Sequence, residues 1–414
     1  MKDKQAKYPQ LRFKGFTDPW EERRLSEIVT EHNSGVYIAK DEYGSGTNII
    51  GVGDIYESDL VDGQVFRLAP VKDEKFILHS RDLLYGESSL VQEGIARVVS
   101  VTDKGAGTAF AWHTRRFVVE PVVADSQFVM LELNYWFPAR EHLMRTATKT
   151  ALTGITTQDF FSTNILVPIL LEQKKICDLV RLLDNLITVN QRKLAKLKEL
   201  KQGYLQKLFP KNGAKVPELR FAGFADAWVQ RNLGEWSDVR DGTHASPKYI
   251  EQGHPMVTSK NLTDSGLDMS DVSYLTDEDF NEINQRSKVD IGDILFGMIG
   301  TIGKPVIVDR DDFAIKNVAL IKEKTSPEII NTWLIQYLNS PSFERFIQKE
   351  NAGGTQKFIA LGLIRDMKLM TPSVQEQARI GELLNHLDNL IAANQRKLDL
   401  LKEQKKGFLQ KMFV

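Results

Sequence analysis

The sequence predicts an α+β protein built from two copies of one long unit, each a globular head of mixed α/β structure followed by a long helix. The helix is repeated, because "LDNLITVNQRKLAKLKELKQGYLQKLFP" from Leu183 to Pro210 returns as "LDNLIAANQRKLDLLKEQKKGFLQKMFV" at the end of the chain. The start of the unit is repeated as well: "YPQLRFKGFTDPWEERRL" from Tyr8 returns as "VPELRFAGFADAWVQRNL" from Val216. A chain of 414 residues is also longer than one hydrophobic core usually serves.

The matching segments keep the same order in both copies. Trp20 corresponds to Trp228 in the repeated opening segment. Between the repeated ends the likeness is weak, although "SGVY" at Ser34 aligns with "DGTH" at Asp241. Units of this length indicate duplication of a domain with its connector rather than a short-period solenoid.

Each head is predicted to contain strands with a few helices. Runs of β-branched and aromatic residues such as "IARVVSV", "RRFVVEPVV" and "KPVIVDRDDF" are separated by Gly, Asp and Asn, which is typical of strands between turns. Helical spacing occurs in "LNYWFPAREHLMRTA" and "PEIINTWLIQYLNSPSFERFIQKE". The predicted domains are residues 1–165 for the first head, 166–215 for the first helical region and a hinge, 216–368 for the second head and 369–414 for the second helical region.

An apolar seam follows each predicted long helix in alternating steps of four and three residues, the heptad spacing of a coiled coil. In the first copy the seam positions are Ile176, Val180, Leu183, Ile187, Asn190, Leu194, Leu197, Lys201, Tyr204 and Leu208. In the second copy they are Ile380, Leu384, Leu387, Ile391, Asn394, Leu398, Leu401, Lys405, Phe408 and Met412. At 1.5 Å per residue, a first helix from Glu172 to Phe209 would be about 57 Å long.

Both seams contain an asparagine at the same place, Asn190 in the first copy and Asn394 in the second. A polar Asn in an apolar seam weakens packing but disfavours wrong registers, because only one alignment gives its amide a partner. We therefore interpret Asn190 and Asn394 as coiled-coil register residues of two helices that pair with each other. The alternative is that each apolar stripe packs on its own head.

The composition, with 42% hydrophobic and 26% charged residues, is that of a folded protein. The single cysteine, Cys177, cannot form an internal disulfide, and the sequence shows neither an apolar stretch of membrane-spanning length nor a secretory leader. These features predict a cytoplasmic protein. The formal net charge is −1, so the chain has no global positive field, and a nucleic-acid partner would have to meet a local basic patch.

The sequence shows no catalytic motif. A DNA methyltransferase would need a Gly-rich cofactor loop and an Asn/Asp-Pro-Pro-aromatic run, and neither is found. "GVGDIY" at Gly51 lacks the third glycine of a dinucleotide loop, and "GMIGTIGKP" at Gly297 has the wrong spacing for a phosphate loop. The seven histidines show no paired metal spacing, and one cysteine cannot build a zinc site. We expect neither catalytic residues nor metal ligands in this chain.

Small, amide and basic residues recur together in predicted loops, a combination that suits DNA. Lysine supplies charge for counterion release, glycine allows close approach to phosphates, and Asn or Gln can bind an adenine edge. The candidate DNA-binding residues are Arg97, Gln127, Lys149 and Thr150 in the first head, and Thr243, His244, Lys260, Asn261, Lys304, Lys316, Asn317, Thr355, Gln356 and Lys357 in the second. The alternative is that they are ordinary solvated loop residues, with His244 a turn residue.

Taken together, these motifs resemble the specificity subunit of type I restriction-modification systems. The resemblance covers essentially the whole chain and rests on the pattern "P…EQ..I…LD.LI…….L..LK..K.G.LQ.LF", present from Pro168 to Phe209 and from Pro372 to Phe413. The openings "P.LRF.GF…W…L" and the "DGTH" at Asp241 are also typical of that family. The first head departs from it, since it has "SGVY" in place of "DGTH".

The resemblance implies a pseudo-twofold arrangement in which the two helices form an intramolecular antiparallel coiled coil between two target-recognition domains. Each head would recognise one half of a bipartite DNA target, and the helices would dock two methyltransferase subunits, which restriction subunits then join. S-adenosylmethionine, ATP and Mg²⁺ would serve those partner subunits, so that this chain needs no cofactor and is not an enzyme. The alternatives are a coiled-coil scaffold without a DNA role and a self-contained DNA methyltransferase or nuclease.

Overall fold

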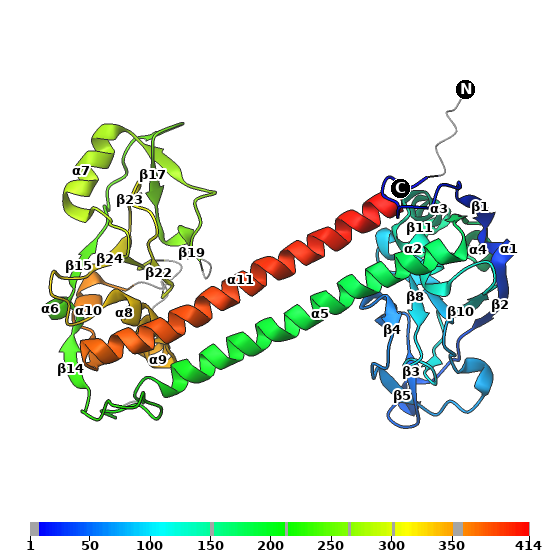
Figure 1. The fold of residues 1–414 in the computed structure, drawn as a ribbon, viewed down its shortest axis with the longest axis horizontal. Coiled ribbons are helices and arrows are strands. Elements are labelled where there is room, and N and C mark those ends of the chain that lie inside the picture. The colour runs from blue at the N-terminus through cyan, green and yellow to red at the C-terminus, as the bar shows by residue number, and fades with distance from the viewer. Residues whose placement is uncertain are drawn as a thin grey trace. The chain divides into compact units, whose positions relative to one another are not determined.

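The computed structural model describes residues 8–149, 153–211, 214–263, 266–299, 303–350 and 359–413 (Figure 1). The chain divides into two compact units, the first formed by Met1–Val189 with Asp399–Val414 and the second by Asn190–Leu398. Two long helices, α5 (Leu170–Lys207) and α11 (Val374–Met412), contribute to both units. Each unit therefore contains one head, the start of one long helix and the end of the other.

The first head is a mixed α/β structure around a mainly antiparallel sheet. The sheet runs in the order β2 (Val29–Ser34), β10 (Thr114–Val119), β6 (Leu83–Gly86), β8 (Val98–Val101) and β4 (Leu60–Val61), the last of which is parallel to β8. Smaller sheets are β1 (Glu21–Arg24) with β13 (Asn164–Val167), β5 (Arg67–Ala69) with β3 (Thr47–Ile50) and β9 (Ala109–Phe110), and β11 (Thr148–Lys149) with β12 (Thr153–Gly154) and β7 (Ser88–Ser89). The helices are α1 (Leu25–Ile28), α2 (Ser126–Tyr135), α3 (Phe137–Thr146) and α4 (Thr157–Phe161), with short 3₁₀ turns η1 (Lys40–Glu42), η2 (Asp54–Tyr56), η3 (Glu74–Phe76) and η4 (Gln92–Gly94).

The second head repeats this plan. Its main sheet runs in the order β15 (Asp238–Asp241), β24 (Val318–Lys322), β21 (Ile294–Gly297) and β22 (Pro305–Ile307). Smaller sheets are β14 (Val229–Asn232) with β25 (Lys368–Thr371), β18 (Leu262–Thr263) with β19 (Gly266–Leu267), and β16 (Tyr249–Ile250), β20 (Ser273–Leu275), β17 (His254–Val257) and β23 (Ala314–Ile315) in that order. The helices are α6 (Leu233–Trp236), α7 (Asp277–Ser287), α8 (Asn331–Leu338), α9 (Pro341–Glu350) and α10 (Leu361–Arg365), with one 3₁₀ turn, η5 (Ser259–Asn261).

The two heads share one strand order. Strands β2, β10, β6 and β8 of the first head correspond to β15, β24, β21 and β22 of the second, and in both heads these neighbours are antiparallel. Each head also has one parallel pair beside the main sheet, β3 with β9 in the first and β17 with β23 in the second. The predicted α+β class and the duplication of the unit are confirmed by this topology.

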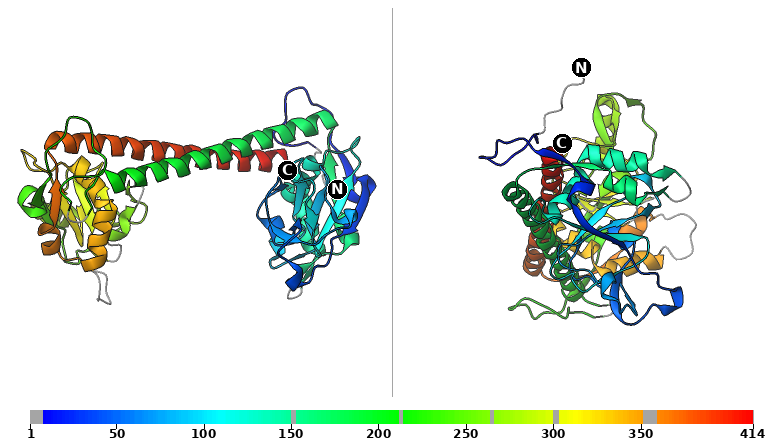
Figure 2. Two further views of the ribbon diagram at one scale, coloured as in Figure 1. Left: turned by 90° about the horizontal axis from the view of Figure 1, so that it is seen from below. Right: turned by 90° about the vertical axis from the view of Figure 1, so that its right-hand side faces the viewer.

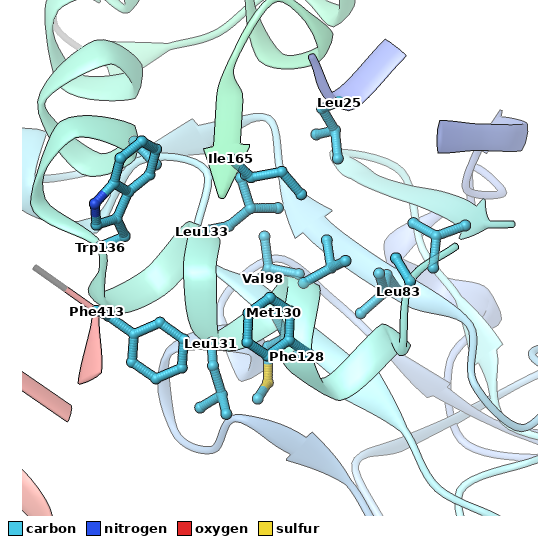
Figure 3. Packing of buried hydrophobic residues seen from close by; sticks show 14 of the residues in the cluster. Leu25, Leu83, Val98, Phe128, Met130, Leu131, Leu133, Trp136, Ile165 and Phe413 are labelled. Carbon is cyan, nitrogen blue, oxygen red and sulfur yellow. The ribbon is translucent and has the colours of Figure 1, made fainter. Parts of the chain in front are cut away.

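The core of the first unit joins the head to the last residues of the chain. Phe413 lies against Phe128 of α2 with 5.8 Å between ring centroids (Figure 3). Trp20 lies against the same Phe128 ring at 5.7 Å. The backbone N–H of Leu11 donates to the carbonyl of Lys411 at 3.0 Å. The first head is thus closed by the end of α11, whose red carboxyl end lies beside the start of α5 in both Figure 1 and Figure 2.

The second unit is closed in the same way by the end of α5. Phe209 contacts Trp228 at 6.4 Å and Trp333 at 5.9 Å between ring centroids. The N–H of Leu219 donates to the carbonyl of Lys207 at 2.9 Å, which is the counterpart of the bond in the first unit. Each head is therefore closed by the long helix that follows the other head in the sequence: α11 closes the first head and α5 closes the second.

The predicted seams lie on the inner faces of α5 and α11. The buried seam residues are Ile176, Val180, Leu183, Asn190, Leu194, Leu208, Ile380, Leu384, Leu387, Asn394, Leu398, Leu401 and Met412. Within the second unit, Leu205 and Leu208 of α5 share a core with Leu384 and Leu387 of α11, so the helices pair and run antiparallel. The alternative that each apolar stripe packs on its own head also holds in part, because Ile176 at the start of α5 packs on the first head.

Candidate nucleic-acid interface

The "DGTH" segment of the second head leaves the main sheet at the end of β15. Gly242 follows Asp241, and a Cβ at Gly242 would lie 2.4 Å from the carbonyl oxygen of Ile315, so this position requires glycine. The next residue, Thr243, donates its N–H to that same carbonyl at 3.0 Å and forms a parallel bridge with Lys316. The close approach of these two backbone segments places Thr243 and His244 beside Lys316 and Asn317.

His244 is held between two oxygen acceptors while more than half of its side chain is exposed (56%). Its Nδ1 lies 2.7 Å from Oδ1 of Asn317 and its Nε2 lies 2.8 Å from Oδ2 of Asp241. The hydrogen bond with Asn317 and then that with Asp241 raise the pKa of His244, because both favour the protonated ring. The protonated form of His244 is thus favoured, and the ring is held from both sides.

Asp241 is shared between His244 and Arg286 of α7, whose Nη2 donates to Oδ1 of Asp241. Burial alone would raise the pKa of Asp241, but the hydrogen bond from His244 and the charge of Arg286 outweigh it and leave the pKa lowered. One carboxylate therefore faces both the His244 ring and the cationic Arg286. Arg286 was not predicted as a site residue, since it lies on an exposed face of a polar helix and only the tertiary structure brings it to this loop.

Lys316 completes the basic surface beside His244. Its Nζ lies 3.3 Å from Oγ of Ser246 and 3.5 Å from the hydroxyl of Tyr249, and it stands 6.0 Å from the centre of the Tyr249 ring. The structure thus brings together four of the predicted residues, from two distant parts of the sequence. We call Thr243, His244, Lys316 and Asn317 the His244 cluster.

The η5 turn adjoins the His244 cluster, because Oγ of Ser259 donates to the carbonyl of Asn317 at 3.3 Å. Lys260 on this turn pairs with Asp271 at 2.9 Å and is 56% exposed. Asn261 is 2% exposed, and its Nδ2 donates to the carbonyls of Asp268 and Asp271, both at 3.0 Å. Asn261 therefore supports the loop that presents Lys260.

Two of the predicted residues, Arg97 and Gln127, belong to the first unit. Arg97 is bound within the first head by Asp59 at 2.5 Å; burial disfavours its charge, but Asp59 and Tyr135 outweigh burial and raise the pKa of Arg97. Gln127, in the first turn of α2, accepts a hydrogen bond from Arg181 of α5 at 2.5 Å. These contacts give Arg97 and Gln127 structural partners inside the first unit.

The remaining six predicted residues lie in or next to segments outside the described residues. Lys149 ends β11, and Thr150 lies outside the described residues. Thr355, Gln356 and Lys357 also lie outside them. Lys304 lines a cavity of about 610 Å³ in the second unit, together with Lys201 and Asp388 of the long helices.

The first head has the same backbone frame at the corresponding place. A Cβ at Gly35 would lie 2.1 Å from the carbonyl oxygen of Ala111, Val36 forms a parallel bridge with Ala111, and the N–H of Trp112 donates to the carbonyl of Val36 at 2.7 Å. In the second head the matching bond runs from Asn317 to Thr243 at 3.2 Å. The frame is therefore duplicated while the side chains on it differ.

The profile of the family described as "Type I restriction modification DNA specificity domain" matches residues 17–199 and again residues 226–403. The two matches together cover most of the chain, and each contains one head with most of its long helix. The chain belongs to this family. Members of the family recognise DNA targets for type I restriction-modification systems, and the predicted resemblance is confirmed.

Two curated relatives come from Methanocaldococcus jannaschii. The MjaX specificity subunit of a type I restriction enzyme is 26% identical over 197 residues, which is 45% of this chain and 45% of that protein. The MjaVIII specificity subunit is 25% identical over 291 residues, 67% of this chain and 68% of that protein. The match with the MjaX protein therefore spans less than half of the length of that relative.

Two solved structures share the fold. The S subunit of a type I restriction-modification system from M. genitalium has a TM-score of 0.64 at 15% identity and covers 98% of this chain and 99% of that chain. A chain from a study of complex assembly and conformational transition of the type I R-M system has a TM-score of 0.52 at 17% identity, with coverage of 95% and 97%. At these identities the likeness establishes the fold.

No group of three or more His, Cys, Asp and Glu side chains in the described part of the chain is arranged to hold a metal ion. None of the helices described there is both long enough and apolar enough to span a membrane.

Proposed function

We propose that this chain is the subunit that selects the DNA sequence of a type I restriction-modification complex, and that each head recognises one half of a bipartite target. The observation that carries the proposal is the duplicated frame: Gly35 and Gly242 occupy the same close backbone approach, yet the loops beyond them carry different side chains. A shared frame with different contact residues suits two unequal half-sites. Specific base contacts depend on the side chains, whereas phosphate contacts set the position on the duplex.

The His244 cluster has the chemistry of a DNA contact in the second head. His244 and Lys316 provide positive charge, and Asn317 and Thr243 provide groups that hydrogen-bond base edges or phosphates. Lys260 extends the same surface through the η5 turn. The proposed contact is local, which agrees with a net charge close to zero.

We further propose that α5 and α11 dock methyltransferase subunits on their outer faces. Leu182 and Val189 of α5 are 55% and 60% exposed within the first unit, and Leu186 between them is 38% exposed. Apolar side chains at this helical spacing form a stripe of the kind that packs against a partner protein. In this proposal S-adenosylmethionine belongs to the methyltransferase subunits, ATP and Mg²⁺ belong to restriction subunits, and this chain contributes no catalytic group.

The test uses the full chain assembled with its methyltransferase subunits. We expect methylome sequencing of cells that carry the complex to show one bipartite methylated motif, and we expect binding to that duplex to weaken steeply with salt. Lys316→Ala together with Lys260→Ala should reduce the salt slope, and the matched control Lys324→Ala, on the same head, should leave it unchanged. Sequence-blind or salt-insensitive binding would overturn the proposal and favour a scaffold. Methyl transfer by the purified chain alone would favour a self-contained enzyme.

A further inference from the structure

The first head carries an exposed aromatic group where the second head carries the His244 cluster. Tyr37 occupies the position of His244, and Trp112 occupies that of Asn317. The two rings meet edge to face with 5.2 Å between centroids, and Trp112 stacks on His113 at 4.5 Å and 11°. Tyr37 is 67% exposed and Trp112 is 48% exposed.

This aromatic group is rigidly supported from below. Nδ1 of His113 lies 2.8 Å from Oε1 of Glu87, and Oε2 of Glu87 accepts from Nε of Arg115 at 2.6 Å. The N–H of Glu87 also donates to the carbonyl of His113 at 3.0 Å. His113 has a φ of 69°, which an L-residue rarely adopts, and it precedes β10 as Asn317, with a φ of 55°, precedes β24. These contacts hold the His113 ring on which Trp112 stacks.

The charges around the rings are compatible with a polyanion. Glu87 is the carboxylate in contact with His113, and it is paired with Arg115. The Nη1 of Arg115 donates to Oγ of Ser34. Ser34 stands where the second head has Asp241. The carboxylate beside the rings is therefore paired, and the exposed groups that this head presents at Tyr37 and Trp112 are aromatic, where the second head presents His244 and Asn317.

We infer that Tyr37 and Trp112 determine the base preference of the first head by apolar contact with thymine C5-methyl groups in the major groove. Thymine alone presents a methyl group there, and apolar side chains select it. Rings that are already ordered lose little further entropy on binding. The inference rests on the proposed function and adds to it the substrate chemistry of one head.

The first experiment selects duplexes from a random library with the full chain and its methyltransferase subunits. Trp112→Ala and Tyr37→Ala are expected to relax the preference in one half-site only, and Trp112→Phe should retain most of it. His244→Ala is the matched variant of the other head and should relax the other half-site. If Trp112→Ala leaves both half-sites unchanged, or alters the half-site that His244→Ala alters, the inference is wrong.

The second experiment replaces each thymine of the affected half-site by deoxyuridine, which lacks only the methyl group. Binding should weaken roughly fourfold at the contacted thymine, as expected for one buried methyl group, and Trp112→Ala should remove this difference. A half-site without thymine, or one in which no replacement weakens binding, contradicts the inference. A complex that shows no sequence preference in either half-site would instead refute the proposed function, so the two failures are distinguishable.

Discussion

Lys201 of α5 pairs with Asp388 of α11 at 2.5 Å inside the second unit, and inside the first unit Lys405 of α11 pairs with Asp184 of α5 at 2.6 Å. The lysine side chains are only 17% and 19% exposed. Lys201 and Lys405 occupy the same seam position in the two repeated helices. Each unit therefore has one such ion pair between α5 and α11. We expect these pairs to disfavour shifted registers, because a shifted alignment would leave a largely buried ammonium without its carboxylate.

We predict a coupling of about 1 kcal/mol between Lys201 and Asp388, the size expected for a partly exposed ion pair. Asp388 also accepts from Nε2 of Gln336 at 3.0 Å, so Asp388→Ala should destabilise the chain more than Lys201→Ala does. A double-mutant cycle measured by denaturant unfolding gives the coupling. The matched cycle at Lys405 and Asp184 should give a similar value, and no coupling at either place would show that the pairs do not constrain the register.

We predict that Arg12→Ala destabilises the first unit by about 3 kcal/mol, because it leaves a buried carboxylate unpaired. Arg12 binds Glu172 through two hydrogen bonds of 2.7 Å, and Glu172 is 1% exposed. Adding Glu172→Gln should recover part of the loss. Arg220 and Glu376 form the same pair in the second unit, so Arg220→Ala is the internal control. Thermal unfolding that is unaffected by Arg12→Ala would count against this role.

We predict that DNA binding by the second head weakens as pH rises through the pKa of His244. The pKa of His244 is raised, so the protonated ring is fully present below its ordinary value near 6.5 and is lost only above it. Asn317→Ala removes the leading cause and should move the titration to lower pH. The measurement is NMR titration of His244 beside DNA affinity at each pH. If affinity does not follow the titration, the charge of His244 has no part in binding.

We predict that Asn190→Leu together with Asn394→Leu raises stability and loosens the register of the helix pair. Both asparagines are buried, and Nδ2 of Asn394 donates to the carbonyl of Leu390 at 2.7 Å. Unfolding measures the stability. Spin labels at the exposed positions 202 and 385, with Cys177 replaced, measure the distance between the helices within the second unit. A lower stability, or an unchanged width of the distance distribution, would refute the register role.

We predict opposite effects for two glycine substitutions. Gly242→Ala should destabilise the second head, because the new Cβ would lie 2.4 Å from a backbone carbonyl that cannot move away cheaply. Gly407→Ala should stabilise α11 by up to about 1 kcal/mol, since alanine is the better helix former and no atom lies within 4 Å of the new Cβ. Thermal unfolding of both variants checks the pair. A neutral Gly242→Ala would show that the backbone approach is not needed.

The site was only partly predictable. "DGTH" gave Thr243 and His244, and composition gave Lys316 and Asn317, but a parallel bridge between distant segments is what brings the two pairs together. Arg286 and Trp112 carried no local signal, because neither lies in a motif. Tyr37 could have been found from the alignment of "SGVY" with "DGTH". Asn261 was predicted to bind DNA because an amide can bond a base edge, but it is buried and its amide holds the loop after η5.

The sequence by itself determined the duplication, the two long helices and their apolar seams. These follow from the repeated segments and from heptad spacing, which are local properties of neighbouring residues. Only the tertiary structure decided the strand order of the heads, the closure of each head by the helix that follows the other, and the side chains that share each frame. Those features depend on pairings between residues far apart in the chain, such as Leu11 with Lys411, and no local pattern specifies them.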